Sequence, residues 1–270
     1  MLRILGKSLK SGLVTSAYPQ ASDSPAAGFR GLPEWLPVNC DRCGRCASQC
    51  PTQAITLGAV DRYWSIDARR CLFCGYCEDA CTHQALRLGL QYELAEKVTP
   101  GKNGFPEKFR NKLQTGSGEQ HSFGQEGQGR AEPEIANEGI FGRSVHIRHL
   151  DAGSCNGCDW EMVNLTGPVY DIQRLGFDFV ASPRHADLLM VTGPVTRNLE
   201  IAVRRTFAAT PAPKLVVAAG TCACSGGICG RSYASAGGVD NILPVEVYIP
   251  GCPPRPQALI DGLLKAVHRR

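Results

Sequence analysis

The sequence predicts two unlike domains in one chain: a small α+β domain that repeats itself internally, followed by an α/β domain built on a parallel sheet. The first prediction rests on two cysteine runs, each followed by a short β-prone stretch, at residues 53–57 and 84–88. The second rests on apolar strand candidates that alternate with helical stretches after about residue 140. The chain has 270 residues, 14 cysteines and a net charge of only +4, which leaves no electrostatic case for binding nucleic acid.

The two cysteine runs share one spacing, Cys-x2-Cys-x2-Cys-x3-Cys, beginning at Cys40 and at Cys71. Two intervening residues let neighbouring thiolates converge on one cube, while the longer last gap sends the fourth thiolate to the other cube. The spacing therefore predicts a bacterial-type ferredoxin domain with two [4Fe–4S] clusters that carry electrons. Disulfides are rare in cytosolic chains, and zinc sites do not need the third and fourth cysteine. The expected ligand sets are Cys40, Cys43, Cys46 and Cys81 for the first cluster, and Cys71, Cys74, Cys77 and Cys50 for the second.

The segments on either side of this domain, which we bound at residues 31–99, differ from it in composition. Within residues 1–30, leucines recur at three- and four-residue intervals from Leu2 to Leu13 with basic residues between them. This pattern predicts an amphipathic helix that docks on its own domain or on another subunit, with direct contact to lipid as the lesser alternative. Residues 100–140 are rich in Gly, Gln, Glu and Lys and predict a linker or strap.

The remaining residues, 141–270, are expected to form the α/β domain. No apolar run approaches the roughly twenty residues that span a bilayer, and the first residues lack the apolar stretch of a signal peptide, so a cytoplasmic location is expected. The strand candidates are Val145–Leu150, Phe177–Ala181, Leu188–Val191, Leu215–Ala219 and Val245–Ile249, and the helical stretches lie near 158–175, 197–209 and 256–268.

Four further cysteines follow three of these strands. Cys155 and Cys158 come after the first strand, Cys222 after the fourth and Cys252 after the last. Ligands of a parallel sheet lie beyond the carboxyl ends of its strands, so these thiols are expected to meet at one edge. They suffice for one more cubane cluster, which the eight upstream cluster cysteines favour, although zinc fits the same four ligands.

Several motifs of this domain resemble the small subunit of membrane-bound, energy-converting [NiFe] hydrogenases (group 4), above all the formate hydrogenlyase branch. That family is related to the 20 kDa subunit of complex I, in which two adjacent cysteines usually replace the Cys155-x2-Cys158 pair. The amino-terminal half resembles the ferredoxin-like subunit of the same complexes, so the chain is similar to a fusion of two subunits. The motifs are 154–161, 182–187, 192–196, 222–227 and 247–256, with 16–19 and 91–94 in the first half.

The resemblance implies a flavodoxin-like domain whose cluster lies beside the nickel–iron centre of a separate large subunit, similar to the 49 kDa subunit of complex I. It implies membrane-arm partners, a formate dehydrogenase or another ferredoxin-like electron donor, and a peripheral place on the cytoplasmic face of the inner membrane. The chain would act as an oxidoreductase subunit that is not catalytic alone and binds no nickel itself.

Five other residues carry weaker expectations. Glu161 matches an acidic position of the family and is expected to relay protons, to orient the interface, or to favour a helix start through its charge. Arg184 and His185 are expected near the third cluster or as a solvated interface pair. Cys224 and Cys229 are expected as small buried thiols, with an alternate-ligand or redox-sensitive role left open.

Two other functions stay open at this point. One is a complex I-like module that passes electrons to quinone, which differs from a hydrogenase in the sequence of the large subunit. The other is a non-catalytic ferredoxin fused to a structural zinc domain, which differs in metal content. Three cubanes would give about twelve irons per chain.

Overall fold

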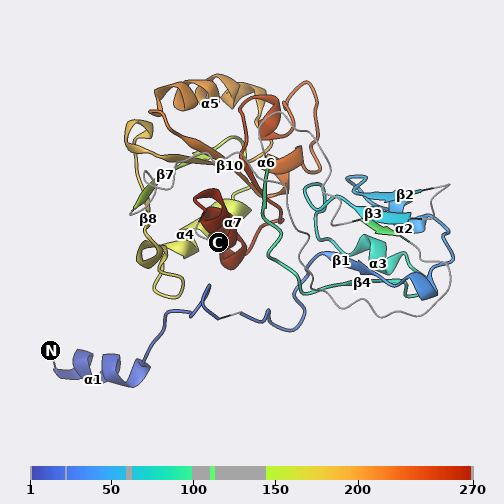
Figure 1. Cartoon of the computed structure of the whole chain (residues 1–270), viewed down its shortest axis with the longest axis horizontal. Coiled ribbons are helices and arrows are strands. Elements are labelled where there is room, and N and C mark those ends of the chain that lie inside the picture. The colour runs from blue at the N-terminus through green and yellow to red at the C-terminus, as the bar shows by residue number, and fades with distance from the viewer. Residues whose placement is uncertain (1, 22, 59–62, 99–109, 113–143, 269–270) are drawn as a thin grey trace, which may run out of the picture.

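The computed structural model describes residues 2–21, 23–58, 63–98, 110–112 and 144–268. Two bodies lie side by side in Figure 1, the ferredoxin domain and a larger domain built on a six-stranded sheet. The ferredoxin domain contains β1 (Pro33–Trp35), α2 (Arg45–Ser48), β2 (Ile55–Leu57), β3 (Tyr63–Ile66), α3 (Tyr76–Asp79) and β4 (Leu86–Leu88). A 3₁₀ turn, Pro37–Asn39, precedes the first cysteine run.

The internal repeat of the sequence is also a repeat of backbone conformation. Each half has a short helix that begins after a left-handed glycine, Gly44 in the first half and Gly75 in the second. Gln53 and Gln84, which follow the fourth cysteine of each run, both have φ of 51°. Positive φ values turn the chain sharply, so the backbone of each cysteine run curves around one centre before it enters the following β-strand.

Two small sheets close the ferredoxin domain. β1 pairs antiparallel with β4, and β3 pairs antiparallel with both β2 and β6 (Arg110–Lys112). Trp35 and Trp64 stack between the sheets with their ring centroids 5.9 Å apart. They belong to a small apolar core that includes several of the cysteines, and a core of this size supplies little stability without a bound metal.

The second domain alternates strands and helices as the sequence predicts. Its elements in order are β7 (Val145–Asp151), α4 (Gly157–Leu165), β8 (Phe177–Phe179), β9 (Leu188–Thr192), α5 (Arg197–Ala209), β10 (Leu215–Ala219), α6 (Thr221–Ser225), β11 (Val247–Ile249) and α7 (Pro256–Ala266), with 3₁₀ turns at Ile172–Leu175, Pro183–His185 and Val239–Asn241.

The strands of this domain form a mostly parallel sheet in the order β5-β11-β10-β9-β7-β8. Alternate residues along each strand face opposite layers. Met190 packs in one core with residues of α4 and α7, while its neighbours Leu189 and Val191 pack in the other with Val203 of α5. The domain is therefore a sheet between two helical layers, and its cysteine loops leave the carboxyl ends of the strands.

Segments of the amino-terminal half are built into this second domain. The antiparallel edge strand β5 (Glu96–Lys97) pairs with β11. Tyr18 is 1% exposed and packs in the α/β core, and the amide of Ser16 donates to the carbonyl of Val169 at 2.7 Å. Helix α1 (Leu2–Ser11) lies apart from both domains in Figure 1. The two halves are thus interlaced rather than joined at a single point.

Two predicted segments do not correspond to single elements of the structure. The helical stretch predicted near 158–175 is not one helix, because α4 ends at Leu165 and a separate 3₁₀ turn begins at Ile172. Gly167 and Pro168 separate them, and a proline restricts the residue before it to extended conformations. The predicted linker at 100–140 lies outside the described residues apart from the short strand β6.

Candidate metal centres

Four thiols predicted for the first cluster line one cavity of the ferredoxin domain. Three come from the first cysteine run and the fourth from the end of the second, and the indoles of Trp35 and Trp64 complete the wall. All are free cysteines, with Cys43 exposed and the other three half-buried. The structure brings together Cys40, Cys43, Cys46 and Cys81.

The four thiols predicted for the second cluster line a separate cavity. Its other walls are apolar, formed by side chains such as Pro33, Ile55 and Ile66. Burial raises the pKa of Cys71 and of Cys77 to about 12, so both remain neutral thiols at neutral pH until a cation binds them. This cavity groups Cys50, Cys71, Cys74 and Cys77.

Backbone amides point at sulfur in the same way in both repeats. The amide of Ala54 donates to Cys50 Sγ and that of Ala85 to Cys81 Sγ, each at 3.2 Å. Such bonds stabilise the negative charge of a thiolate and raise the reduction potential of a cluster bound to it. The left-handed glutamines before these alanines produce the turn that makes the bonds.

A third group of thiols meets at the carboxyl edge of the large sheet. The pKa of Cys158 is raised to about 12, mainly by burial and also by the thiols of Cys222, Cys155 and Cys252, in that order. The segments that follow β7, β10 and β11 supply these four cysteines, with Cys158 at the start of α4 and Cys222 at the start of α6. Cys155 and Cys252 are exposed while Cys158 and Cys222 are half-buried, so the group is open on one side.

Glycines leave room at two sulfur atoms of the third group. A Cβ built on Gly220 would lie 2.5 Å from Cys158 Sγ, and one built on Gly227 would lie 2.8 Å from Cys222 Sγ. Both distances are shorter than any real Cβ contact. Only glycine therefore lets the backbone approach these thiols so closely.

A polar network that sequence reasoning missed lies behind the third group. His149 Nε2 is 3.1 Å from Asp159 Oδ1 and 3.0 Å from Thr192 Oγ1. The other oxygen of Asp159 accepts from the hydroxyl of Ser154 at 2.7 Å. Burial lowers the pKa of His149, and the carboxylate of Asp159 acts in the opposite direction. The network ties β7 and β9 to the loop that carries the first two cysteines.

The surface around Glu161 is more apolar than the sequence indicates. Glu161 is half-buried on α4, where Asn164 Nδ2 donates to its carboxylate at 3.4 Å. Its neighbours Trp160 and Val163 are 70% and 61% exposed, although tryptophan is usually buried on average. The sequence shows a tryptophan two residues after the cysteine pair, but its exposure is known only from the structure.

The placement of Arg184 and His185 bears on the two alternatives expected for them. Both belong to the 3₁₀ turn at Pro183–His185, which precedes β9 and lies at the amino ends of the parallel strands. The cysteine loops leave the carboxyl ends, so of the two alternatives the position beside the third group is not observed. Both side chains are exposed.

The two extra cysteines differ in environment. Cys224 is buried in the core, with a thiol that donates to the carbonyl of Ala218 at 3.5 Å. Cys229, expected to be buried, is exposed instead. It lies near enough to Cys222 to raise the pKa of that thiol, although burial and the thiol of Cys252 have larger effects on it.

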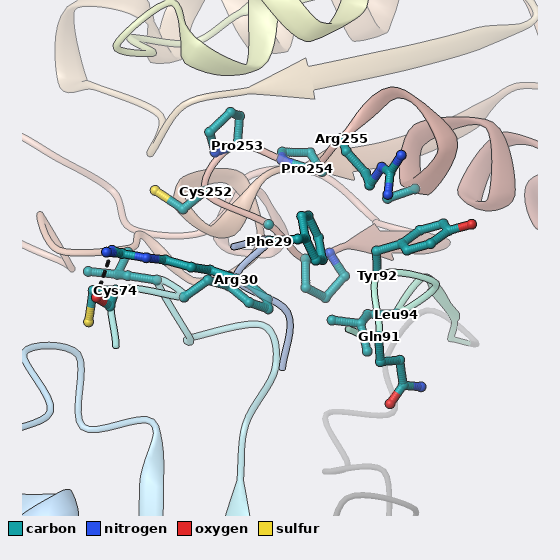
Figure 2. A pocket seen from close by; sticks show the side chains of 15 residues that line it. Phe29, Arg30, Cys74, Gln91, Tyr92, Leu94, Cys252, Pro253, Pro254 and Arg255 are labelled. Carbon is teal, nitrogen blue, oxygen red and sulfur yellow. Dashed lines mark hydrogen bonds between the residues drawn. The ribbon is translucent and has the colours of Figure 1, made fainter. Parts of the chain in front are cut away.

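A cavity of about 290 Å³ lies between the two domains. Figure 2 shows Cys74 of the ferredoxin domain and Cys252 of the α/β domain at the same end of it. Arg30 crosses beside them and donates to the carbonyl of Cys74 at 3.0 Å. The second and third thiol groups therefore face one another across the domain boundary.

Arg255 closes the other end of this cavity. Its guanidinium lies 4.5 Å from the ring centroid of Tyr92 and 5.4 Å from that of Phe29, and Nη2 donates to Asp23 at 2.9 Å. Cation–π contacts of this kind join residues far apart in the chain. Arg255 thus fastens the amino-terminal half onto the start of α7.

Two kinds of feature are missing from the part of the chain that the structure describes. Within those ranges, no three His, Cys, Asp or Glu side chains converge tightly enough for a single metal ion. Among the helices of the same residues, none has the length and apolarity to cross a membrane.

Fold and thiol groups together define a class of protein in which a ferredoxin domain is joined to an α/β domain with further cysteines. Residues 39–85 match the 4Fe-4S dicluster domain family. Residues 155–266 match the family described as NADH ubiquinone oxidoreductase, 20 Kd subunit. The chain belongs to this 20 kDa subunit family, and it carries the dicluster domain in the same polypeptide.

Three relatives align with the second half of the chain. The probable membrane-bound hydrogenase subunit mbhJ of Pyrococcus furiosus is 44% identical over 130 residues, 48% of this chain and 78% of that protein. Formate hydrogenlyase subunit 7 of Escherichia coli is 44% identical over 125 residues, 46% of this chain and 49% of that protein. An NADH-quinone oxidoreductase subunit of Heliobacterium modesticaldum is 46% identical over 109 residues, 40% of this chain and 62% of that protein.

Proposed function

We propose that this chain is an electron-transfer subunit of a membrane-bound hydrogenase complex and carries three [4Fe–4S] clusters. Family membership and the dicluster domain support the electron-transfer role. The proposed ligands are the first thiol group (Cys40, Cys43, Cys46, Cys81), the second (Cys50, Cys71, Cys74, Cys77) and the third (Cys155, Cys158, Cys222, Cys252). Each cluster, when bound, takes up and releases one electron at a time.

The chemistry of the three thiol groups fits such clusters. Each group offers four free cysteines, the number that a cubane requires. In the first group, the buried indole Nε1 of Trp35 has no hydrogen-bond partner among the described residues, so it could donate to sulfur there. In the third, Gly220 and Gly227 leave space where a side chain would strike a ligand sulfur.

One observation carries the proposal: Cys74 and Cys252, from the second and third groups, line the same cavity. The first group lines a cavity of its own. This arrangement supports a path of electron transfer from the first group through the second to the third. Electrons from a donor would therefore enter near Cys43, the exposed thiol of the first group, and the reverse flow uses the same path.

The open side of the third group is the proposed surface for the large subunit. Cys155 and Cys252 are exposed there, and Trp160 adds a large exposed ring on α4. Aromatic residues are enriched at protein interfaces. We propose that a large subunit with a nickel–iron centre covers this surface, and that Glu161 orients the interface or relays protons across it.

Two remaining features support, in turn, a flavodoxin-like fold for the α/β domain and a peripheral place in the complex. The parallel strands in chain order are β7, β8, β9, β10 and β11, so the sheet order is 2-1-3-4-5, the order of flavodoxin-like folds. Helix α1 exposes Ile4 and Leu9, and Leu13 just after the helix is also exposed, which favours docking on membrane-arm subunits at the cytoplasmic face of the inner membrane.

The test is metal and activity analysis of the complex isolated with its large subunit. We expect about twelve irons and twelve labile sulfides for this chain, nickel in the large subunit, and hydrogen oxidation with an artificial dye. About eight irons with one zinc would refute the third cluster. A nickel-free large subunit that supports quinone reduction would replace the hydrogenase by a complex I-like module.

A further inference from the structure

Two hydroxyl groups of α6 cross the domain boundary to the loop that leads into the second cysteine run. Thr221 Oγ1 lies 2.8 Å from the carbonyl oxygen of Cys71, and Ser225 Oγ lies 2.9 Å from that of Arg69. Thr221 is 1% exposed, so its hydroxyl has no access to water. These contacts join residues about 150 positions apart in the chain.

The hydroxyl of Thr221 has one proton and two carbonyl oxygens within reach. The carbonyl of Gly251 is 3.1 Å away, but it already accepts the amide of Thr221 at 2.8 Å. The carbonyl of Cys71 is nearer to the hydroxyl, at 2.8 Å. The geometry therefore directs the proton to Cys71, because buried carbonyl groups require a donor.

This contact makes a continuous connection between two thiol groups. Thr221 is bonded to Cys222 of the third group, and Cys71 belongs to the second. From Cys71 Sγ to Cys222 Sγ the path follows covalent bonds throughout, except for the single hydrogen bond between the carbonyl and the hydroxyl. The other facing pair, Cys74 and Cys252, is separated by a cavity instead.

We propose that the Thr221 hydroxyl is the link through which an electron passes between the second and the third thiol group. The inference rests on the proposed function, because it requires a cluster in each group. In the step, the cluster on one side loses one electron and the cluster on the other gains it, with no bond broken and no proton transferred. Thr221 acts through the two cysteines and is a positioning residue.

Other contacts hold the same loop in place without the Thr221 hydroxyl. The guanidinium of Arg69 lies 5.1 Å from the ring centroid of Tyr248 on β11. Ser225, three residues after Cys222, adds its own hydrogen bond to the carbonyl of Arg69, which lies two residues before Cys71. Ser225 is therefore a matched control, since its hydroxyl makes the same kind of interdomain bond but is not attached to a ligand cysteine.

The experiment compares Thr221→Val, Thr221→Ser and Ser225→Ala in the full chain with its clusters. One electron is injected by pulse radiolysis, and the rate of its redistribution between the clusters is followed optically. Paramagnetic resonance verifies the content and the potential of each cluster. We expect Thr221→Val to slow the redistribution several-fold with potentials unchanged, Thr221→Ser to restore the rate, and Ser225→Ala to leave it unaffected.

An unchanged rate in Thr221→Val, or equal slowing by Thr221→Val and Ser225→Ala, would overturn the inference, as would failure of serine to restore the rate. If valine lowers the cluster content, Thr221→Ala is compared with Thr221→Ser on the same readout. A wild-type chain without the third cluster would instead refute the proposed function, so the two failures are distinguishable.

Discussion

Replacing Gly220 by alanine should remove the third cluster and leave the two ferredoxin clusters in place. Gly220 has φ of 89° and ψ of 153°, a region essentially restricted to glycine that costs another residue on the order of 1–3 kcal/mol. The new Cβ would also lie 2.5 Å from Cys158 Sγ. Because α6 starts at the next residue and contains Cys222, the strain falls directly on the segment that carries this thiol.

Iron analysis and paramagnetic resonance give the readout. The iron content should fall from about twelve to about eight per chain, with one signal lost. Gly230→Ala is the matched control, since φ there is 55° but nothing lies within 4 Å of the added Cβ, and its left-handed strain of about 1–2 kcal/mol should spare all clusters. Three intact clusters in Gly220→Ala would refute the reasoning.

Four other variants test the remaining contacts. Cys252→Ala should abolish one resonance signal and hydrogen turnover while Cys224→Ala, whose thiol donates to a core carbonyl, should keep every signal; the opposite result would mean that the ligand was misassigned. Burial lowers the pKa of His149 from its ordinary value of 6.5, so the unfolded chain binds the proton first as the pH falls and stability drops below that value. His149→Gln should flatten the dependence of the unfolding temperature on pH between about 7 and 5, and an unaltered slope would contradict the assignment. Arg255→Met removes two cation–π contacts and a partly exposed ion pair and should cost about 1–3 kcal/mol, seen as a lower thermal midpoint; no change would show that the clamp contributes nothing.

Local spacing predicted the grouping of the ferredoxin thiols, because this grouping depends on only a few backbone turns. Two or three residues between cysteines leave little freedom, and the repeated left-handed turns at Gln53 and Gln84 place the fourth thiol of each run in the other group. The third group was predictable for a different reason. Carboxyl ends of parallel strands meet at one edge, so Cys155, Cys222 and Cys252 were expected to converge.

For two segments the structure departs from an expectation or disfavours one of its alternatives, although the sequence contained the signals for both. Arg184 and His185 precede a strand, and residues before a parallel strand lie at the edge opposite the cysteine loops. Gly167 and Pro168 interrupt the predicted helix, as a glycine before a proline commonly does. Both differences follow from local rules rather than from distant contacts.

Long-range contacts could not be predicted from any pattern along the chain. The burial of Tyr18 in the α/β core and the pairing of β5 with β11 depend on packing between segments far apart in sequence. The exposure of Trp160 likewise depends on which face of α4 the sheet covers. A hydrophobic residue alone does not reveal whether its partner lies in the same chain.

The sequence by itself determined that the cysteines belong to a ferredoxin domain and to the loops of a parallel sheet, because spacing and alternation are local properties. Only the tertiary structure decided which ferredoxin group lies against the α/β domain. That choice depends on the contacts of Thr221 and Ser225 with residues 69–71 and of Arg255 with Tyr92. These contacts join surfaces whose complementarity arises only after both domains have folded.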